Sequence, residues 1–117
     1  MAWIFRGIAY ERSKKPTEAL ENFTKATELF PEDSAGFFYR ATVLRSLGRF
    51  AEALESIETV LRLEPEDTES MAEKIAILYN LEKYQEAKDF YDKFKDGLAD
   101  NKVAQDHVQL INEKLTK

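Results

Sequence analysis

Cysteine is absent from the 117-residue chain. The protein therefore has no disulfide framework, no thiolate metal site and no cysteine nucleophile. Histidine occurs once, at His107 beside Asp106, and spacing places no serine, threonine or second histidine close to it. We therefore predict that the protein is not an enzyme.

Glycine and proline are scarce, with four and three residues, and no linker or low-complexity tract separates parts of the chain. Long apolar runs are missing as well. Arg6 interrupts the apolar residues at the start, so this segment predicts neither a signal peptide nor a membrane span. We expect a soluble, single-domain protein and a cytoplasmic location.

Positive charge is also in deficit, because 22 acidic residues face 17 basic ones and give a formal net charge of −5 at pH 7. This charge has the wrong sign for binding nucleic acid or an anionic membrane, so we predict neither partner. Asp89, Asp92 and Asp96 share one helical face, but lysines alternate with them, and hard cations need oxygens that converge from several elements. We expect a solvated face there, and no metal or cofactor.

The chain does contain an internal repeat. Residues 1–67 show the same pattern of side-chain sizes twice, at an offset of 34 positions. The matching pairs are Trp3/Phe37, Arg6/Arg40, Gly7/Ala41, Tyr10/Leu44, Ala19/Ala53, Phe23/Ile57, Ala26/Val60 and Pro31/Pro65.

A weaker third copy follows the first two. It departs from them where bulky Ile75 replaces the small residue and where Ala99 replaces the proline. Beyond it, apolar residues recur at the spacing of one helical face and predict one further helix. These residues are Ala104, Val108, Ile111 and Leu115.

Large and small residues that alternate in this way, with a closing proline and a 34-residue period, are typical of tetratricopeptide repeats, and the sequence resembles that family. The resemblance implies an all-α fold, a right-handed α-α superhelix of seven helices. It implies one domain over 1–117, with repeats at 1–33, 34–67 and 68–100 and a capping helix at 101–117. We expect helices at about 2–14, 17–30, 35–47, 51–63, 69–81, 85–96 and 102–115.

Local chemistry marks the helix ends. Asp33 and Asp67, each followed by a hydroxyl residue, can accept hydrogen bonds from the first turn of the next helix. Pro16 suits the opening turn of the second helix. Gly48 suits a left-handed end to the third helix.

The resemblance also implies a binding groove, because the first helix of each repeat lines the concave side in this family. We interpret five large apolar residues there as the informative ones, since the core does not require them: Ile4, Ile8, Phe38, Tyr39 and Tyr79. The alternative is that some of them only cover neighbouring helices. The full predicted groove is Ile4, Phe5, Ile8, Arg12, Phe38, Tyr39, Thr42, Arg45, Glu73, Ala76, Tyr79 and Asn80.

One subclass of this family holds the C-terminal carboxylates of heat-shock chaperones with lysine, arginine and asparagine. The matching positions here are Ile4, Ile8, Tyr39, Glu69 and Glu73. Glutamates repel a carboxylate and isoleucines donate no hydrogen bond to it. We therefore predict that this chain is not a carboxylate-clamp co-chaperone.

The resulting hypothesis is a protein-interaction module, a scaffold or adaptor, that binds a short peptide or an amphipathic helix through apolar anchors in its groove. Two alternatives stay open. The first is a self-associating structural module, in which a homo-oligomer forms. The second is a regulatory fragment of a longer repeat protein.

Overall fold

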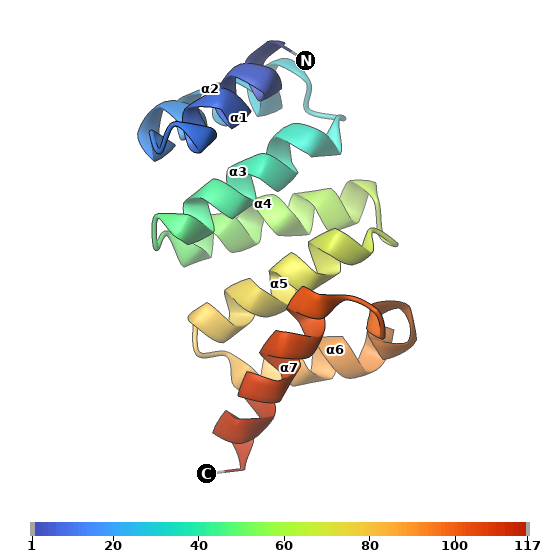
Figure 1. Cartoon of the computed structure of the whole chain (residues 1–117). Coiled ribbons are helices and arrows are strands. Elements are labelled where there is room, and N and C mark those ends of the chain that lie inside the picture. The colour runs from blue at the N-terminus through green and yellow to red at the C-terminus, as the bar shows by residue number, and fades with distance from the viewer. Residues whose placement is uncertain (1, 117) are drawn as a thin grey trace. The chain divides into compact units, whose positions relative to one another are not determined.

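The computed structural model describes residues 2–116, and every element in this stretch is an α-helix (Figure 1). The predicted all-α fold is therefore confirmed for the described residues. The helices are α1 Ala2–Arg12, α2 Pro16–Leu29, α3 Ser34–Ser46, α4 Phe50–Leu63, α5 Thr68–Asn80, α6 Tyr84–Leu98 and α7 Lys102–Leu115.

These helices fall into two compact units. Unit 1 spans Met1–Pro65 and contains α1 to α4, whereas unit 2 spans Glu66–Lys117 and contains α5 to α7. The boundary lies close to the one predicted between the second and third repeats. The division of a single domain into three repeats and a capping helix stays a prediction.

Two helix ends differ from the sequence-based expectation. α1 ends at Arg12, two residues early, because Lys14 adopts a left-handed backbone conformation with φ of 60°. α6 continues to Leu98, past the expected end at residue 96. The third repeat has Ala99 in place of the closing proline, and the fully buried Leu98 side chain holds the extra turn against the core.

The starts of α2 and α3 follow the predicted capping chemistry. Asp33 accepts a hydrogen bond from the backbone N–H of Ala35 at 3.0 Å, as predicted, and Pro16 opens α2. The same prediction is wrong for Asp67, whose carboxylate accepts a hydrogen bond from the Ser70 hydroxyl at 2.7 Å. That bond joins two side chains of the first turn and leaves the backbone N–H groups to other partners.

The turns inside the three helix pairs share one backbone conformation. Lys14, Gly48 and Glu82 occupy equivalent positions, 34 residues apart, and their φ angles are 60°, 78° and 61°. The left-handed end predicted at Gly48 is confirmed. Only the second repeat places there the residue that accepts this conformation without strain.

The interior of unit 1 lies between two antiparallel helix pairs, α1 with α2 and α3 with α4. Phe23, Leu44 and Ile57 are fully buried there. α1 and α2 approach most closely at Gly7, where a Cβ atom would lie 2.7 Å from Phe23 Cδ1. Glycine at this position is therefore a packing requirement of the first repeat.

Arg40 connects three helices of unit 1. Its side chain starts on α3 and donates hydrogen bonds to the Thr24 hydroxyl on α2 at 3.1 Å and to the Ser56 hydroxyl on α4 at 2.6 Å. Ser56 is buried, so this bond satisfies a hydroxyl group that water does not reach.

In unit 2, α7 packs against both α5 and α6 (Figure 1). Ala104, Val108 and Ile111 of its apolar face are buried, as the spacing predicted, whereas the fourth member of the predicted face, Leu115, is 40% exposed at the end of the helix. Gln105 fixes α7 to α6, because its amide donates hydrogen bonds to the Tyr91 hydroxyl at 3.0 Å and to the Leu98 carbonyl at 2.9 Å.

Candidate partner-binding surface

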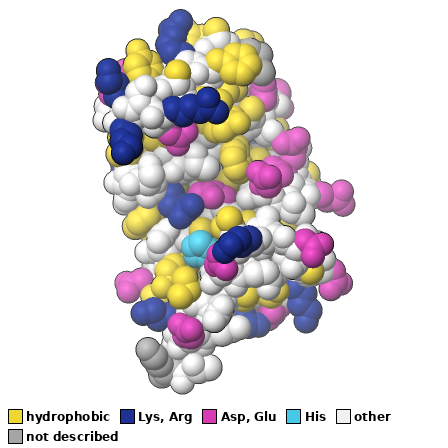
Figure 2. Space-filling model, in the orientation of Figure 1, with side chains coloured by type: hydrophobic (Ala, Val, Ile, Leu, Met, Phe, Trp, Pro, Cys, Tyr) yellow, Lys and Arg dark blue, Asp and Glu magenta, His cyan; other side chains and the backbone are white. Residues whose placement is uncertain are grey.

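The predicted groove residues of unit 1 lie on α1 and α3, which are in contact with each other. Phe5 is the most exposed of them, with 64% of its surface accessible. Arg12 is exposed as well, at the last turn of α1. The other positions are half-buried: Ile8, Phe38, Tyr39, Thr42 and Arg45. Figure 2 shows apolar side chains exposed over this part of the molecule.

Ile4 does not belong to this exposed set. It is only 5% exposed and packs in one cluster with Phe23 and Val43. The expectation that the core does not require Ile4 is therefore wrong. The physical reason is that Val43 of α3, in the next repeat, packs in the same cluster as Ile4. The sequence pattern of α1 alone does not predict this contact.

Ile8 and Tyr39 are only partly exposed, because both pack against the same cluster. The Tyr39 ring stacks on Phe23, with ring centroids 5.4 Å apart. Phe38 then meets Tyr39 edge-on at 5.7 Å. The two neighbouring aromatic residues of α3 thus form a supported pair, with Tyr39 anchored in the core and Phe38 next to it on the surface.

The polar residues around this pair are largely engaged. The Thr42 hydroxyl donates to the Tyr39 carbonyl at 2.8 Å, a bond within α3 that stabilises its own helix. Arg45 lies one turn further along α3, at its C-terminal end, where positive charge is favourable. At the matching end of α1, partial burial raises the pKa of the Glu11 carboxyl.

The predicted groove residues of unit 2 are covered. Glu73 and Ala76 are buried, so the structure corrects their assignment to an open surface. Tyr79 contacts two rings, Tyr84 at 5.6 Å and His107 of α7 at 5.7 Å. Asn80 is half-buried at the end of α5. Within unit 2, α7 therefore lies against the α5 face that carries Tyr79.

The contact between His107 and Tyr79 was not predicted. A signal was present, because His107 follows Ala104 by three positions and so lies on the buried side of α7.

Other classes of site have little support in residues 2–116. This part of the chain contains no group of three or more histidine, aspartate or glutamate side chains that could hold a metal ion. None of its helices is long and apolar enough to cross a lipid bilayer.

A sequence model of the family described as tetratricopeptide repeat matches two overlapping segments, residues 6–57 and 38–101. Together they cover most of the chain. The chain belongs to the tetratricopeptide repeat family. No curated protein sequence matches it significantly.

Solved structures show the same tetratricopeptide repeat fold. The first such domain of Spaghetti (RPAP3), bound to the HSP90 peptide SRMEEVD, is 23% identical, with a TM-score of 0.92 over 99% of this chain and 92% of that chain. The first domain of human RPAP3 is 24% identical, with a TM-score of 0.88 over 97% of this chain and 90% of that one.

The tetratricopeptide repeat domain of Sgt2 from Aspergillus fumigatus is similar as well. It is 17% identical, with a TM-score of 0.89 over 98% of this chain and 78% of that chain. At these levels of identity the similarity shows the fold alone. The ligand of the present chain depends on its own side chains.

Proposed function

We propose that this chain is a non-catalytic protein-interaction module that holds a short peptide or an amphipathic helix on the α1/α3 surface of unit 1. The observation that carries the proposal is the exposed ring of Phe5 on α1, together with the half-buried rings of Phe38 and Tyr39 on the neighbouring helix α3. Grouped aromatic residues on a surface are common anchors for protein partners. Arg12 and Arg45 lie on the same two helices and add hydrogen-bond donors at the rim. A cytoplasmic location stays a prediction.

Related domains support a peptide or protein as the partner. The first tetratricopeptide domain of Spaghetti was solved with an HSP90 peptide, and the TPR2B domain of yeast Sti1 as a complex with pHsp70. A small surface buries less than about 1,200 Å², so we expect dissociation constants in the micromolar range.

We further propose that the ligand is not the acidic chaperone tail that those relatives hold. At the positions of the clamp, Ile4 is buried in the core and Tyr39 stacks on Phe23. Glu73 is a buried carboxylate, and Glu69 adds a second one in the first turn of α5. None of these side chains is a cation that could pair with a terminal carboxylate.

The first test uses selected ligands. Peptides from a random display library would be selected on the full 117-residue chain, and the best binders measured by fluorescence anisotropy. We expect Phe38→Ala to weaken their binding by about tenfold or more, the effect of losing an aromatic anchor. Leu110→Ala removes an exposed apolar side chain of unit 2, outside both proposed surfaces, and should leave their affinity unchanged. Equal affinity for the Phe38 variant and the wild-type chain would refute the assignment.

The second test uses the peptide SRMEEVD, which is the ligand in the Spaghetti structure. We expect no saturable binding to this chain below about 1 mM, because the clamp cations are missing. Micromolar binding would overturn the proposed specificity.

A second copy of the chain is the competing occupant of the α1/α3 surface. Light scattering over a concentration series separates the two cases. A mass that doubles with concentration, and returns to that of the monomer in Phe38→Ala, would assign the surface to self-association instead.

A further inference from the structure

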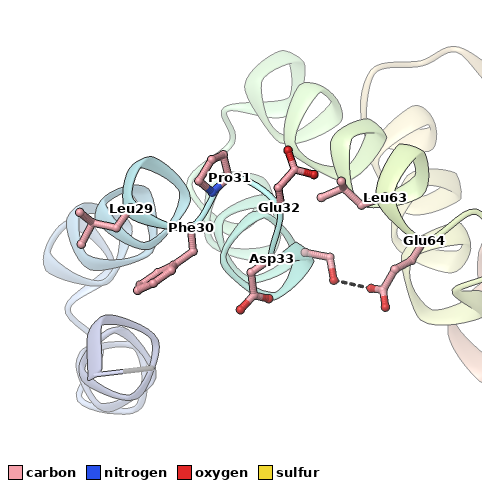
Figure 3. Close-up of a pocket in the computed structure, with 8 residues that line it drawn as sticks. Leu29, Phe30, Pro31, Glu32, Asp33, Leu63 and Glu64 are labelled. Carbon is pink, nitrogen blue, oxygen red and sulfur yellow. Dashed lines mark hydrogen bonds between the residues drawn. The ribbon is translucent and has the colours of Figure 1, made fainter.

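A hollow, separate from the α1/α3 surface, lies at one edge of unit 1, where α2 ends, α3 begins and α4 ends (Figure 3). Its volume is about 830 Å³. None of the residues that line it belongs to the α1/α3 surface described above. They are Leu29, Phe30, Pro31, Glu32, Asp33, Ser34, Leu63 and Glu64.

Large apolar side chains are unusually accessible in this hollow. Leu29 is 50% exposed and Phe30 is 49% exposed, and Leu63 is half-buried across from them. Figure 3 shows Leu63 extending from α4 toward Glu32, and the Phe30 ring and the Asp33 carboxylate extending to the same side of the loop. An exposed ring and a carboxylate are therefore neighbours on one side of this loop.

The repeat comparison shows which of these residues the scaffold requires. Pro31 ends α2 and recurs at residue 65, and Asp33 caps α3. Phe30 has no such role, because the equivalent residue is Glu64 in the second repeat and Leu98 in the third. Leu98 is fully buried in its own repeat, whereas the Phe30 ring remains half-exposed. The fold does not explain an exposed ring at this position.

The charged side chains that line the hollow have a single sign. Glu32, Asp33 and Glu64 contribute carboxylates, and no lining residue is basic. The C-terminal ends of α2 and α4 add the partial negative charge of their free carbonyl groups, whereas the partial positive charge at the start of α3 is capped by Asp33. Figure 2 shows acidic side chains along this edge of unit 1, on the right-hand side of the view.

Hydrogen bonds within the protein occupy only part of the acceptor capacity of these carboxylates. Asp33 accepts one hydrogen bond from the Ala35 N–H, and Glu64 accepts one from the Ser34 hydroxyl. A carboxylate has capacity for about four such bonds. Lys25 and Arg62 are near in sequence, on α2 and α4, but neither lines the hollow.

We propose that this hollow is a second docking surface, which takes a segment of another protein with one large apolar side chain flanked by lysine or arginine. The apolar side chain packs against Phe30, and the flanking cations pair with Asp33 and Glu64. Because the lining is acidic, charge repulsion excludes an acidic peptide. Because the lining is also apolar, a ligand that carries only positive charge would leave its apolar side chains exposed. The proposal is independent of what the α1/α3 surface binds.

A second copy of the chain is a poorer match for the hollow. Phe94 lies between Lys93 and Lys95, but its ring is half-buried and packs on Phe90, with ring centroids 4.9 Å apart. The basic run at residues 12–15 contains arginine and two lysines but no large apolar side chain among them. It would satisfy the carboxylates and leave Phe30 exposed. A heterologous segment that carries both features fits better.

The experiment uses the whole chain labelled with ¹⁵N and a synthetic nonapeptide, Gly-Ser-Lys-Arg-Leu-Arg-Lys-Ser-Gly. Two control peptides replace the leucine by serine or all four cations by glutamate. We expect amide shifts confined to residues 29–34 and 63–64, and saturation with the first peptide only. Higher salt should weaken the binding, because exposed charges are screened.

Variants then separate the two parts of the recognition. Phe30→Ser should weaken binding by about tenfold, and Asp33→Asn with Glu64→Gln should weaken it and reduce its dependence on salt. Asparagine at residue 33 retains an oxygen for the Ala35 N–H, and glutamine at residue 64 retains one for Ser34, so the local fold is preserved. Leu110→Ala removes an exposed apolar side chain of α7, is the matched control and should bind like the wild type.

Three results would overturn the proposal. The first is shifts on α1 and α3 or spread over all acidic surfaces. The second is equal binding of the leucine and serine peptides, which would show charge attraction alone. The third is a dimer in light scattering that Phe30→Ser dissociates, because the occupant would then be a second copy.

Discussion

Phe23 connects the interior of unit 1 with its candidate binding surface. Its ring is fully buried and stacks on Tyr39, which in turn supports Phe38. On another side the ring lies against position 7, where only the hydrogen atom of glycine fits. Because protein interiors are close-packed, the orientation of Phe23 depends on Gly7, and the position of Tyr39 depends on Phe23.

Replacing Gly7 by alanine should therefore destabilise the protein. The added Cβ would lie 2.7 Å from Phe23 Cδ1. Crowding of this kind costs about 1–3 kcal/mol, which exceeds the roughly 1 kcal/mol that alanine gains over glycine in a helix. Urea unfolding followed by circular dichroism measures the change in the free energy of unfolding.

Gly97→Ala is the matched control for this prediction. A Cβ at residue 97 would make an ordinary contact with Thr68 Cγ2 at 3.8 Å. The helix preference of alanine should then prevail and stabilise the protein by up to about 1 kcal/mol. Stabilisation by both substitutions would show that the first helix pair yields to the added methyl group.

Single residues also show where sequence reasoning reached its limit. Position in the repeat predicted that Ile4, Ile8 and Tyr39 point away from their own helix pair. Burial, however, depends on the neighbouring pair as well, and Val43 of α3 completes the cluster around Ile4. Such contacts join residues far apart in the sequence, so the helical period of α1 could not reveal them.

At the scale of the helical elements, the three turns inside helix pairs offer a direct comparison. Residues 14, 48 and 82 share a left-handed conformation, but two of them carry side chains. In that conformation the Cβ of an ordinary residue is crowded by the following carbonyl oxygen, at a cost of about 1–2 kcal/mol. The first and third turns therefore hold strain that the second does not.

Lys14→Gly and Glu82→Gly should each stabilise the protein, by about 0.5–1 kcal/mol after the greater flexibility of glycine in the unfolded chain is subtracted. Thermal unfolding by calorimetry would register both changes.

The reverse substitution, Gly48→Ala, should destabilise by about 1 kcal/mol. Its Cβ would meet no atom within 4 Å, so backbone conformation is the only source of the effect. An unchanged stability of this variant would show that the turn adjusts its backbone freely.

Most helix boundaries were accessible from the sequence because capping, proline and glycine act within a few residues. The starts of α2 and α3 follow from Pro16 and Asp33 in this way. The end of α6 was harder, since its last turn is held by Leu98 in the core. The ring contact between Tyr79 and His107 is a tertiary interaction between α5 and α7, which local rules do not cover.

At the scale of the whole molecule, the chain consists of two compact units. In repeat proteins stability is approximately a sum of repeat terms and nearest-neighbour terms. A defect in one unit should therefore act mainly on the helices of that unit.

Ile111→Ala tests this expectation. Ile111 is fully buried on α7, in unit 2, and truncating such a side chain costs about 2–5 kcal/mol. Hydrogen exchange followed by mass spectrometry should show lost protection in α5, α6 and α7, with smaller changes in α1 and α2. A uniform loss along the chain would mean that the two units unfold as one.

The close approach at Gly7 also determines which gene rearrangements this protein tolerates. The first two repeats are copies, so an unequal crossover in their turns yields one longer and one shorter array. The longer product joins α3 to α2 and sets the methyl group of Ala41 against Phe23, where the native chain has room for a hydrogen atom only. The shorter product joins α1 to α4 and leaves a small gap between Gly7 and Ile57. Lengthening by this route therefore meets a steric barrier that shortening does not.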